Sequence, residues 1–243
     1  MAVNVDLRQG NCMELIKTIP DNSVDFVFTD IPYSEASREN GGIRNTDYGL
    51  ADILTFDIDK FLVEVYRVCK NSICIFCGRE QFSQIYSFFT KTHAGDGTAR
   101  PIVWEKTNPD PVNSDYIYLS GIEMAVWFKK KGAKVFNGKK RNGGKGKNTI
   151  FRYSIGSKEY HPTMKNLQLC EDIILDNTNE GDTVLDTCMG SGQIGIASKR
   201  NKRNFIGFEL DKEFFRIASE RISTGGIADK VVSEEKKKQV SLW

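Results

Sequence analysis

The feature that most constrains the fold of this chain is a regular alternation of short apolar runs with amphipathic segments. In the segment 58–69, for example, Phe61, Leu62 and Val65 recur at the spacing of one helix face. Such alternation predicts an α/β protein with a doubly wound, mainly parallel sheet and helices on both faces. Strands are expected at residues 3–8, 24–29, 72–76, 101–104, 122–128, 183–186 and 205–209, and helices at residues 13–18, 58–69, 82–90, 167–177, 193–200 and 212–222.

One stretch of the chain breaks this pattern. Residues 129–158 carry eleven Lys or Arg, no Asp or Glu, and several glycines. The formal net charge of the chain is only +2, so a nucleic-acid surface would have to come from such local clustering. We therefore expect one domain over residues 1–223, containing 129–158 as a basic insertion, and a charged flexible tail over residues 224–243.

Several classes of protein are disfavoured by composition. No apolar stretch has the length of a bilayer span, and the first residues lack the pattern of a secretory signal, so a soluble cytoplasmic protein is expected. Cys74 and Cys77 form a C-x-x-C on a predicted strand, where residues three apart point to opposite faces. Because His93 and His161 are the only histidines, we expect no metal site and no histidine-based triad.

A glycine-rich turn between a predicted strand and a predicted helix points to a nucleotide-containing cofactor. Residues 190–195 read G-x-G-x-x-G, and Glu209 ends the next strand about 20 residues later. The glycines let the backbone approach a ligand, and the acid can bind both ribose hydroxyls. This pattern fits a nicotinamide dinucleotide as well as S-adenosylmethionine. Asp186 favours the second, because a carboxylate repels a pyrophosphate but attracts the ammonium of a methionine moiety.

A second motif follows the strand expected at residues 24–29. Asp30-Ile31-Pro32-Tyr33 places a carboxylate and an aromatic ring on backbone that the proline makes rigid. Ligands of open α/β sheets bind at the carboxyl ends of the strands, where this motif should lie. It could hold a flat molecule with polar edges, such as a nucleobase.

These motifs resemble those of a known family. Residues 186–192 (DTCMGSG) resemble the D-P-F-x-G-S-G cofactor motif of the amino methyltransferases of DNA, and residues 30–33 (DIPY) resemble their D-P-P-Y catalytic motif. The catalytic motif comes first and the cofactor motif last, which is similar to the circularly permuted β group of that family. Further similar blocks are residues 10–12, 20–25, 161–166 (compare H-P-T-Q-K-P) and 207–211, so the resemblance covers roughly residues 4 to 222.

The chain departs from the family pattern at several positions. Ile31 replaces the first proline of the catalytic motif, Asn11 replaces a common Asp, and Asn166 replaces a Pro. Residues 187–189 replace Pro-x-Phe, where Met189 can still provide apolar contact to a cofactor. Ile31 keeps the backbone carbonyl that the family uses, so activity is expected to survive.

The resemblance implies an S-adenosylmethionine-dependent DNA methyltransferase that modifies the exocyclic 6-amino group of adenine. In such enzymes the Asp30 carboxylate and the Ile31 carbonyl would accept the amino hydrogens, while Pro32 fixes the geometry and Tyr33 stacks on the base. The base must be flipped out of a duplex or be single stranded. Transfer is then direct and in line, without a covalent enzyme intermediate.

The resemblance also implies where the cofactor binds. Glu209 would take the ribose hydroxyls, Asp186 the methionine end, and residues 11–12 the adenine edge. Thr163 and Lys165 would assist at the methionyl carboxylate. The expected cofactor-binding residues are Asn11, Cys12, Asp30, Thr163, Lys165, Asp186, Thr187, Cys188, Met189, Gly190, Ser191, Gly192, Glu209 and Leu210.

Substrate DNA is expected to meet the basic segment 129–158, whose Lys and Arg would neutralise phosphates. The expected contacts are Lys106, Asn108, Lys139, Lys140, Arg141, Lys145, Lys147 and Arg152. Residues 239–243 (QVSLW) resemble the Q-x-x-L-F peptide that docks on the bacterial sliding clamp, so the clamp is one possible partner and a cognate restriction endonuclease another. The expected setting is a prokaryotic cell or a phage-infected host, and both a monomer and a homodimer stay open.

Several alternatives remain. The cytosine 4-amino group is the nearest rival target, although its enzymes more often carry Ser at the position of Asp30, and RNA is a possible substrate. A nicotinamide-dependent oxidoreductase would explain the glycine motif but not residues 30–33. An inactive nucleic-acid-binding module is compatible with the departures at Ile31 and Asn11.

Overall fold

A computed structural model describes residues 3–33, 56–111, 114–155 and 164–226 of the chain. Its strands are β1 (Val5–Gln9), β2 (Val24–Asp30), β3 (Cys69–Cys77), β4 (Gly97–Lys106), β5 (Ile122–Lys130), β6 (Ile150–Tyr153), β7 (Thr183–Asp186) and β8 (Asn204–Glu209). Its helices are α1 (Cys12–Leu15), the 3-10 turn η1 (Ile16–Thr18), α2 (Ile58–Val68), α3 (Arg79–Ser87), the π turn η3 (Phe88–Thr92), α4 (Gly138–Arg141), α5 (Leu167–Asn177), α6 (Gln193–Arg200) and α7 (Lys212–Ser223).

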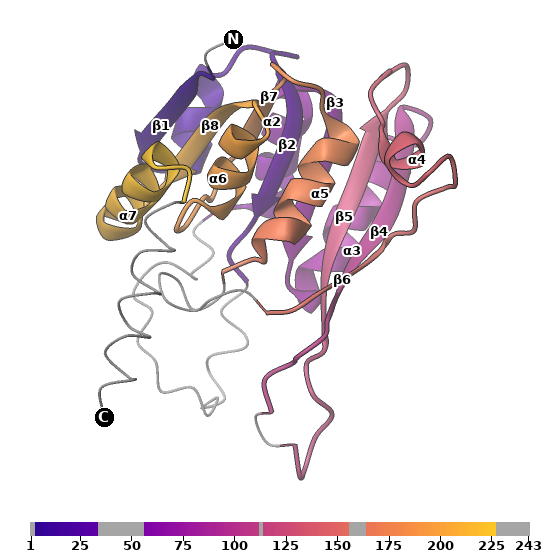
Figure 1. Cartoon of the computed structure of the whole chain (residues 1–243). Coiled ribbons are helices and arrows are strands. Elements are labelled where there is room, and N and C mark those ends of the chain that lie inside the picture. Colours follow the sequence, from indigo (N-terminus) through magenta and orange to yellow (C-terminus); the bar gives the residue numbers. More distant parts are fainter. Residues whose placement is uncertain (1–2, 34–55, 112–113, 156–163, 227–243) are drawn as a thin grey trace, which may run out of the picture.

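These strands form one sheet in the order β1-β8-β7-β2-β3-β5-β4-β6 (Figure 1). β5 pairs antiparallel with β3 and β4, and the other described pairings are parallel. The mainly parallel, doubly wound sheet predicted from the alternation is therefore confirmed. The strand order reverses at the centre, where β2 lies beside β7, and such a switch point is where open α/β sheets bind ligands.

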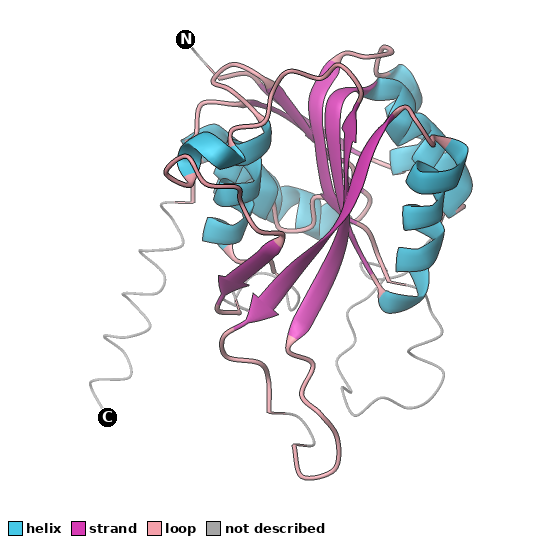
Figure 2. Cartoon of the chain, turned by 90° about the vertical axis from the view of Figure 1, so that its right-hand side faces the viewer, coloured by secondary structure: helices cyan, strands magenta, loops and turns pink. Residues whose placement is uncertain are grey.

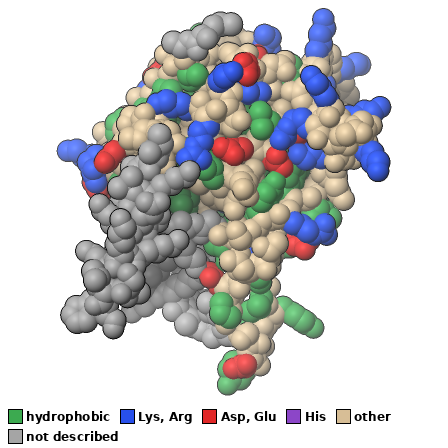
Figure 3. All heavy atoms as spheres, viewed as in Figure 1, with side chains coloured by type: hydrophobic (Ala, Val, Ile, Leu, Met, Phe, Trp, Pro, Cys, Tyr) green, Lys and Arg blue, Asp and Glu red, His purple; other side chains and the backbone are tan. Residues whose placement is uncertain are grey.

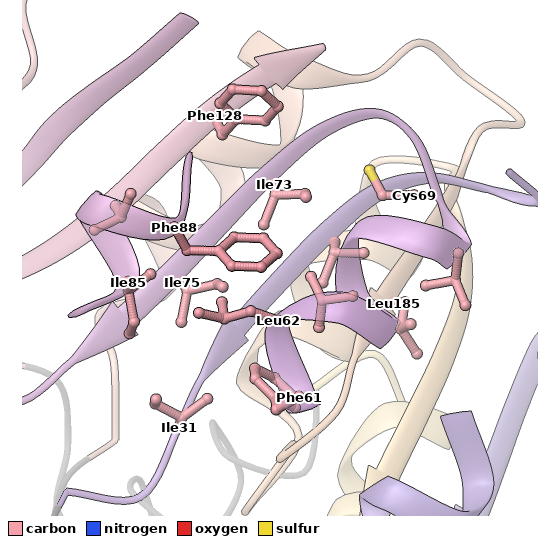
Figure 4. Packing of buried hydrophobic residues seen from close by; sticks show 14 of the residues in the cluster. Ile31, Phe61, Leu62, Cys69, Ile73, Ile75, Ile85, Phe88, Phe128 and Leu185 are labelled. Carbon is pink, nitrogen blue, oxygen red and sulfur yellow. The ribbon is translucent and has the colours of Figure 1, made fainter. Parts of the chain in front are cut away.

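Helices cover both faces of the sheet (Figure 2). On one face, α2 and α3 bury Phe61, Leu62 and Ile85 against β3, as Figure 4 shows. On the other face, α5 and α7 bury Ile173 and Ile222 in a second cluster. Each such side chain contributes roughly 1.5–3 kcal/mol when it is fully buried. None of the described helices has the length and apolar character of a bilayer span.

Each predicted strand and helix is present, and the larger differences concern strand ends. The strand expected at 101–104 runs from Gly97 to Lys106, because Pro101 lies inside it rather than at its start. Proline is tolerated there since Pro101 pairs with Val126 on one side, while β6 joins the other side only from Val103 onward.

The basic segment 129–158 is in part built into the sheet rather than inserted as a separate unit. Residues 129–130 end β5, and β6 pairs in parallel with β4 from Val103↔Ile150 to Lys106↔Tyr153. The short α4 lies in the connection between them. Sequence periodicity missed β6 because four residues interrupted by Arg152 are too short to show a pattern.

Close packing of α6 against its neighbours depends on Gly195, the third glycine of the G-x-G-x-x-G motif. A Cβ atom at this position would lie 2.5 Å from Cδ1 of Ile222 and 2.7 Å from Cε1 of Phe205. Both neighbours are buried in the second core cluster, so neither has free space to move into.

We therefore expect Gly195→Val to lower the free energy of unfolding by about 1–3 kcal/mol through overpacking. Urea denaturation of the purified protein measures this change. Gly146→Val is the matched control, because a Cβ there meets no atom within 4 Å, and it should change stability by less than about 0.5 kcal/mol. An equal loss in both variants would contradict the packing argument.

Candidate active site

The two motifs singled out in the sequence meet at the centre of the sheet. Asp30 ends β2 and Asp186 ends β7, and the two strands pair in parallel. The Thr29 hydroxyl donates a hydrogen bond of 2.8 Å to Oδ1 of Asp186, and its oxygen lies 3.0 Å from Oγ1 of Thr187. The loops after β2 and β7 therefore leave the same edge of the sheet side by side.

The glycine loop after β7 turns back on itself before α6 begins. Gly190 and Gly192 have φ angles of +50° and +83°, in the left-handed region that favours glycine. The amide of Gly192 donates to the carbonyl of Met189 at 2.8 Å, and the amide of Met189 donates to Phe208 on β8 at 2.9 Å. These bonds hold the loop against the neighbouring strand.

Two buried carboxylates flank this loop. Oε2 of Glu209 accepts from the Gly190 amide and Oε1 from the Asp211 amide, both at 2.8 Å, and burial raises the pKa of this carboxyl. Burial raises the pKa of Asp186 to about 7, although hydrogen bonds from Thr29 and the Cys188 amide act in the opposite direction. Among the described residues, neither carboxylate forms an ion pair.

The loop after β1 lies beside Glu209, because the Gly10 amide donates to the Glu209 carbonyl at 2.8 Å. Oδ1 of Asn11 caps α1 by accepting from the Met13 amide, also at 2.8 Å. The thiols of Cys12 and Cys188 interact, and this interaction lowers the pKa of Cys12 and raises the pKa of Cys188. The expected cofactor residues of β1, β7 and β8 are thus brought together.

The catalytic motif is held by its neighbours on β3 and α3. The Ile31 amide donates to the Phe76 carbonyl at 3.1 Å, and the Ile31 side chain is buried in the core. The Gln81 amide group donates to the Pro32 carbonyl at 2.8 Å, while its own oxygen accepts from Gly78. Backbone on both sides of the Ile31–Pro32 peptide is therefore fixed.

Tyr33 lies beside Gly78, since a Cβ built on that glycine would be 3.4 Å from Cγ of the ring. Burial raises the pKa of Tyr33 well above its usual value, and the negative charge of Asp30 adds to the effect. The phenol therefore stays neutral at physiological pH.

A chain of alternating charges runs from Asp30 away from the centre of the sheet. The Lys165 ammonium lies 2.5 Å from Oδ2 of Asp30 and 2.7 Å from Oε2 of Glu123. Lys106 pairs with the other oxygen of Glu123 at 2.8 Å. Lys165 was expected at the methionyl carboxylate of a cofactor, but the structure places it between two carboxylates of the chain itself.

Other expected cofactor residues have varied environments. Thr187 and Met189 are buried, and the Met189 sulfur would lie 2.6 Å from a Cβ at Gly207, so this side chain packs into the core. Ser191 is buried and its carbonyl accepts from Arg221, whereas Leu210 is exposed. Thr163 lies outside the described residues.

Glu123 and Gln81 are site residues that the sequence reasoning missed. Glu123 is an acid within an otherwise apolar predicted strand, and this was a readable signal. Gln81 stands three residues after Gly78, the spacing of a capping box at a helix start. Neither belongs to a motif that carried the resemblance.

The expected DNA contacts do not share one surface. β5 ends at the edge of the sheet opposite to Asp30, so α4 and the connection to β6 lie at that opposite edge, at the upper right of Figure 1. Figure 3 shows Lys and Arg gathered there. The expected contacts at this edge are Lys139, Lys140, Arg141, Lys145 and Lys147.

Two of these basic residues have a structural role. Arg141 and Lys147 each lie 2.6 Å from the buried carboxylate of Asp176, near the end of α5. By contrast, β6 returns to the edge of Asp30, where Lys106, Asn108 and Arg152 lie. Arg152 pairs with Glu105 at 3.0 Å, and Oδ1 of Asn108 accepts from the Ile155 amide at 2.7 Å. The eight expected DNA contacts are therefore divided between the two edges of the sheet.

Comparison with known proteins identifies the family of this chain. Residues 24–220 match the N6/N4 methyltransferase family model, described as DNA methylase. The type II methyltransferase M2.MboI of Moraxella bovis is 30% identical over 239 residues, which cover 90% of this chain and 87% of that protein. M2.DpnII of Streptococcus pneumoniae is also 30% identical, over 89% of this chain and 88% of its own.

Solved structures show the same relationship. The complex of M1.HpyAVI with S-adenosylmethionine is 32% identical, with a TM-score of 0.66 over 89% of this chain and 99% of that one. The cytosine-N4-specific PvuII DNA methyltransferase shares the fold, with a TM-score of 0.69 at 17% identity over 93% of this chain and 92% of that one. The chain therefore belongs to the N6/N4 DNA methylase family and is an S-adenosylmethionine-dependent DNA methyltransferase.

Proposed function

We propose that this methyltransferase modifies the 6-amino group of adenine, with Asp30 and the Ile31 carbonyl as the groups that bind the amino hydrogens. The observation that carries the proposal is the Thr29–Asp186 hydrogen bond, which places the end of β2 directly beside the glycine loop after β7. A base held by Asp30 would therefore lie next to a cofactor held by that loop.

The residues at the switch point fit S-adenosylmethionine. Asp186 and Glu209 are buried acids that accept hydrogen bonds from hydroxyl and amide groups. A cationic methionine end suits Asp186, and ribose hydroxyls suit Glu209. When bound, the cofactor supplies an electrophilic methyl group on a sulfonium.

The chain's own residues would prepare the base. The amino nitrogen of adenine is a poor nucleophile because its lone pair is delocalised into the ring. Acceptance of both amino hydrogens, by the Asp30 carboxylate and the Ile31 carbonyl, would favour a pyramidal nitrogen with a directed lone pair. The hydrogen bonds of the Ile31 amide and the Pro32 carbonyl support this role, because they hold the backbone of the motif in place.

A base inside a duplex cannot reach this edge of the sheet, so it would have to be flipped out at a cost of a few kcal/mol. Stacking on the neutral Tyr33 ring would offset part of this cost. Lys106, Asn108 and Arg152 are the expected DNA contacts at the same edge, and we propose them as the DNA-facing set in place of the five residues around α4.

Cytosine 4-amino methylation is the second candidate, because the same pair of acceptors could bind either amino group and the family model covers both. Asp30 favours adenine, since the related cytosine enzymes more often carry Ser at this position. We expect duplex DNA incubated with radiolabelled S-adenosylmethionine and this protein to yield labelled 6-methyladenine after digestion to nucleosides. Label in 4-methylcytosine alone would instead establish the second candidate.

The relatives named above are type II methyltransferases of bacteria. We propose a bacterial or phage-infected cytoplasm as the setting and a restriction endonuclease of the same specificity as a partner. The clamp-binding peptide expected at residues 239–243 lies outside the described residues and stays a prediction.

Asp30→Ala should lower kcat for methyl transfer by at least about 100-fold, because a preorganised acceptor is lost. The dissociation constant for S-adenosylmethionine should change by less than about threefold, since Asp186 and Glu209 remain. Single-turnover assays and calorimetry measure the two quantities. Asp21→Ala, a change at the opposite end of β2 where the side chain is 68% exposed, is the control. Full activity of Asp30→Ala would refute the assigned role.

Cofactor affinity should rise with pH through the titration of Asp186. The free protein holds this carboxyl with a pKa of about 7, and a bound ammonium would favour its ionised form. Below pH 7 the cofactor must therefore displace a proton. We expect the dissociation constant to fall by about five- to tenfold between pH 6.0 and 7.5.

The Asp186→Asn variant tests the cause of this dependence. It should bind S-adenosylmethionine more weakly and show an almost flat profile over the same range. An unchanged slope in the variant would show that another group titrates.

A further inference from the structure

The row of charged side chains Asp30, Lys165, Glu123 and Lys106 is unusual because its central cation, Lys165, is almost completely enclosed. Lys165 is 5% exposed, and its ammonium lies between Asp30 of β2 and Glu123 of β5. The Phe76 ring of β3 lies 5.0 Å from the same ammonium. Three strands of the sheet thus contribute to one binding site for a lysine side chain.

An enclosed ammonium destabilises a protein unless opposite charges and hydrogen bonds surround it. Burial alone acts against the charge of Lys165, yet the carboxylates of Asp30 and Glu123 raise its pKa well above the usual value. Burial would likewise raise the pKa of Glu123, but Lys165 and Lys106 lower it to about 2. Lys165 and Glu123 therefore both stay charged throughout the physiological range.

Glu123 joins the two lysines of this row, because each of its carboxylate oxygens contacts a different one. The carboxylate comes from β5, opposite Trp104 of β4 in the sheet register, so its position is fixed by strand pairing rather than by a loop. Side chains on regular elements hold a site more rigidly than loop residues do.

We propose that Glu123 is a positioning residue for methyl transfer, which acts through Lys165 to hold the Asp30 carboxylate in one orientation. The inference rests on the proposed role of Asp30 and extends it to a residue on a different part of the sheet. Lys106 contributes by holding the second oxygen of Glu123. Lys165 is accordingly assigned to the carboxylate that binds the base, in addition to any role it has toward the cofactor.

Glu123→Gln should therefore reduce turnover rather than binding. The amide keeps the shape of the side chain but no longer attracts Lys165, so the Asp30 carboxylate loses its fixed partner. We expect kcat to fall by about 10- to 100-fold, the effect of a misplaced catalytic group. Dissociation constants for S-adenosylmethionine and for DNA should stay within about threefold of the unmodified protein.

A matched control distinguishes positioning from a general loss of stability. Asp176 is also a buried carboxylate between two basic side chains, Arg141 and Lys147, but it lies at the opposite edge of the sheet. Asp176→Asn should lower the melting temperature and leave kcat unchanged. A fall in kcat as large as that of Glu123→Gln would overturn the inference.

The link through Lys165 is tested by a double-mutant cycle. Lys165→Met alone should lower kcat at least as much as Glu123→Gln, and adding Glu123→Gln to it should cause less than about a twofold further loss, because both changes break one chain of contacts. A loss of kcat in the double variant equal to the product of the two single-variant losses would overturn the inference. If Glu123→Gln does not fold, Glu123→Asp replaces it, and there a fall in kcat of about tenfold is expected, since the shortened acid no longer reaches both lysines.

Two outcomes separate this inference from the proposed function. If the unmodified protein places label in cytosine rather than adenine, the target assignment fails but the role of Glu123 is still measured on that reaction. If the unmodified protein methylates DNA and Glu123→Gln keeps its full kcat, the proposed function stands and the inference is overturned.

Discussion

The parallel pairing of β2 with β7 is the interaction on which the rest of the site depends. It brings Thr29 and Asp186 into hydrogen-bond contact although they are 157 residues apart in the chain. β8 then extends the same edge and adds Glu209, and β1 adds Asn11. Each of these residues lies within two positions of the carboxyl end of a strand, so the geometry of the sheet determines which polar side chains become neighbours.

The two halves of this edge use charge differently. On the side of β7 and β8, the buried carboxylates of Asp186 and Glu209 accept hydrogen bonds from neutral hydroxyl and amide groups. Their negative charge is therefore available to a cationic ligand that binds reversibly. On the side of β2 and β5, Lys165 lies between Asp30 and Glu123 and Lys106 pairs with Glu123, so the chain itself already balances the negative charge of the two carboxylates. The carboxylates beside β7 and β8 can therefore pair with an incoming cation, whereas the Asp30 carboxylate is already held in place. This difference suits a site that binds a cofactor on one side and orients a base on the other.

Much of this architecture could be predicted from the sequence, because apolar periodicity and glycine spacing are local signals. The bounds of α5, β7 and α6 were predicted correctly for that reason. The partners of Lys165 could not be predicted, because Asp30, Glu123 and Lys165 come from distant segments and their proximity follows from strand order. The position of the basic segment could not be predicted for a related reason: clustering in sequence does not reveal that β5 runs antiparallel and leads to Arg141 and Lys147 at the far edge.

The strand order also has a consequence for how the chain reaches its native state. Among the described strands, β1 and β2 leave the ribosome before β7 and β8, yet β7 and β8 lie between them in the sheet. β1 and β2 therefore lack these neighbours until β7 and β8 have been synthesised, and the central pairing closes over a long separation along the chain. A ribosome-bound chain that stops before β7 contains the catalytic motif but lacks β7 and β8, whose ends form the candidate cofactor site. The two halves of the active site can therefore come together only after β8 has been made.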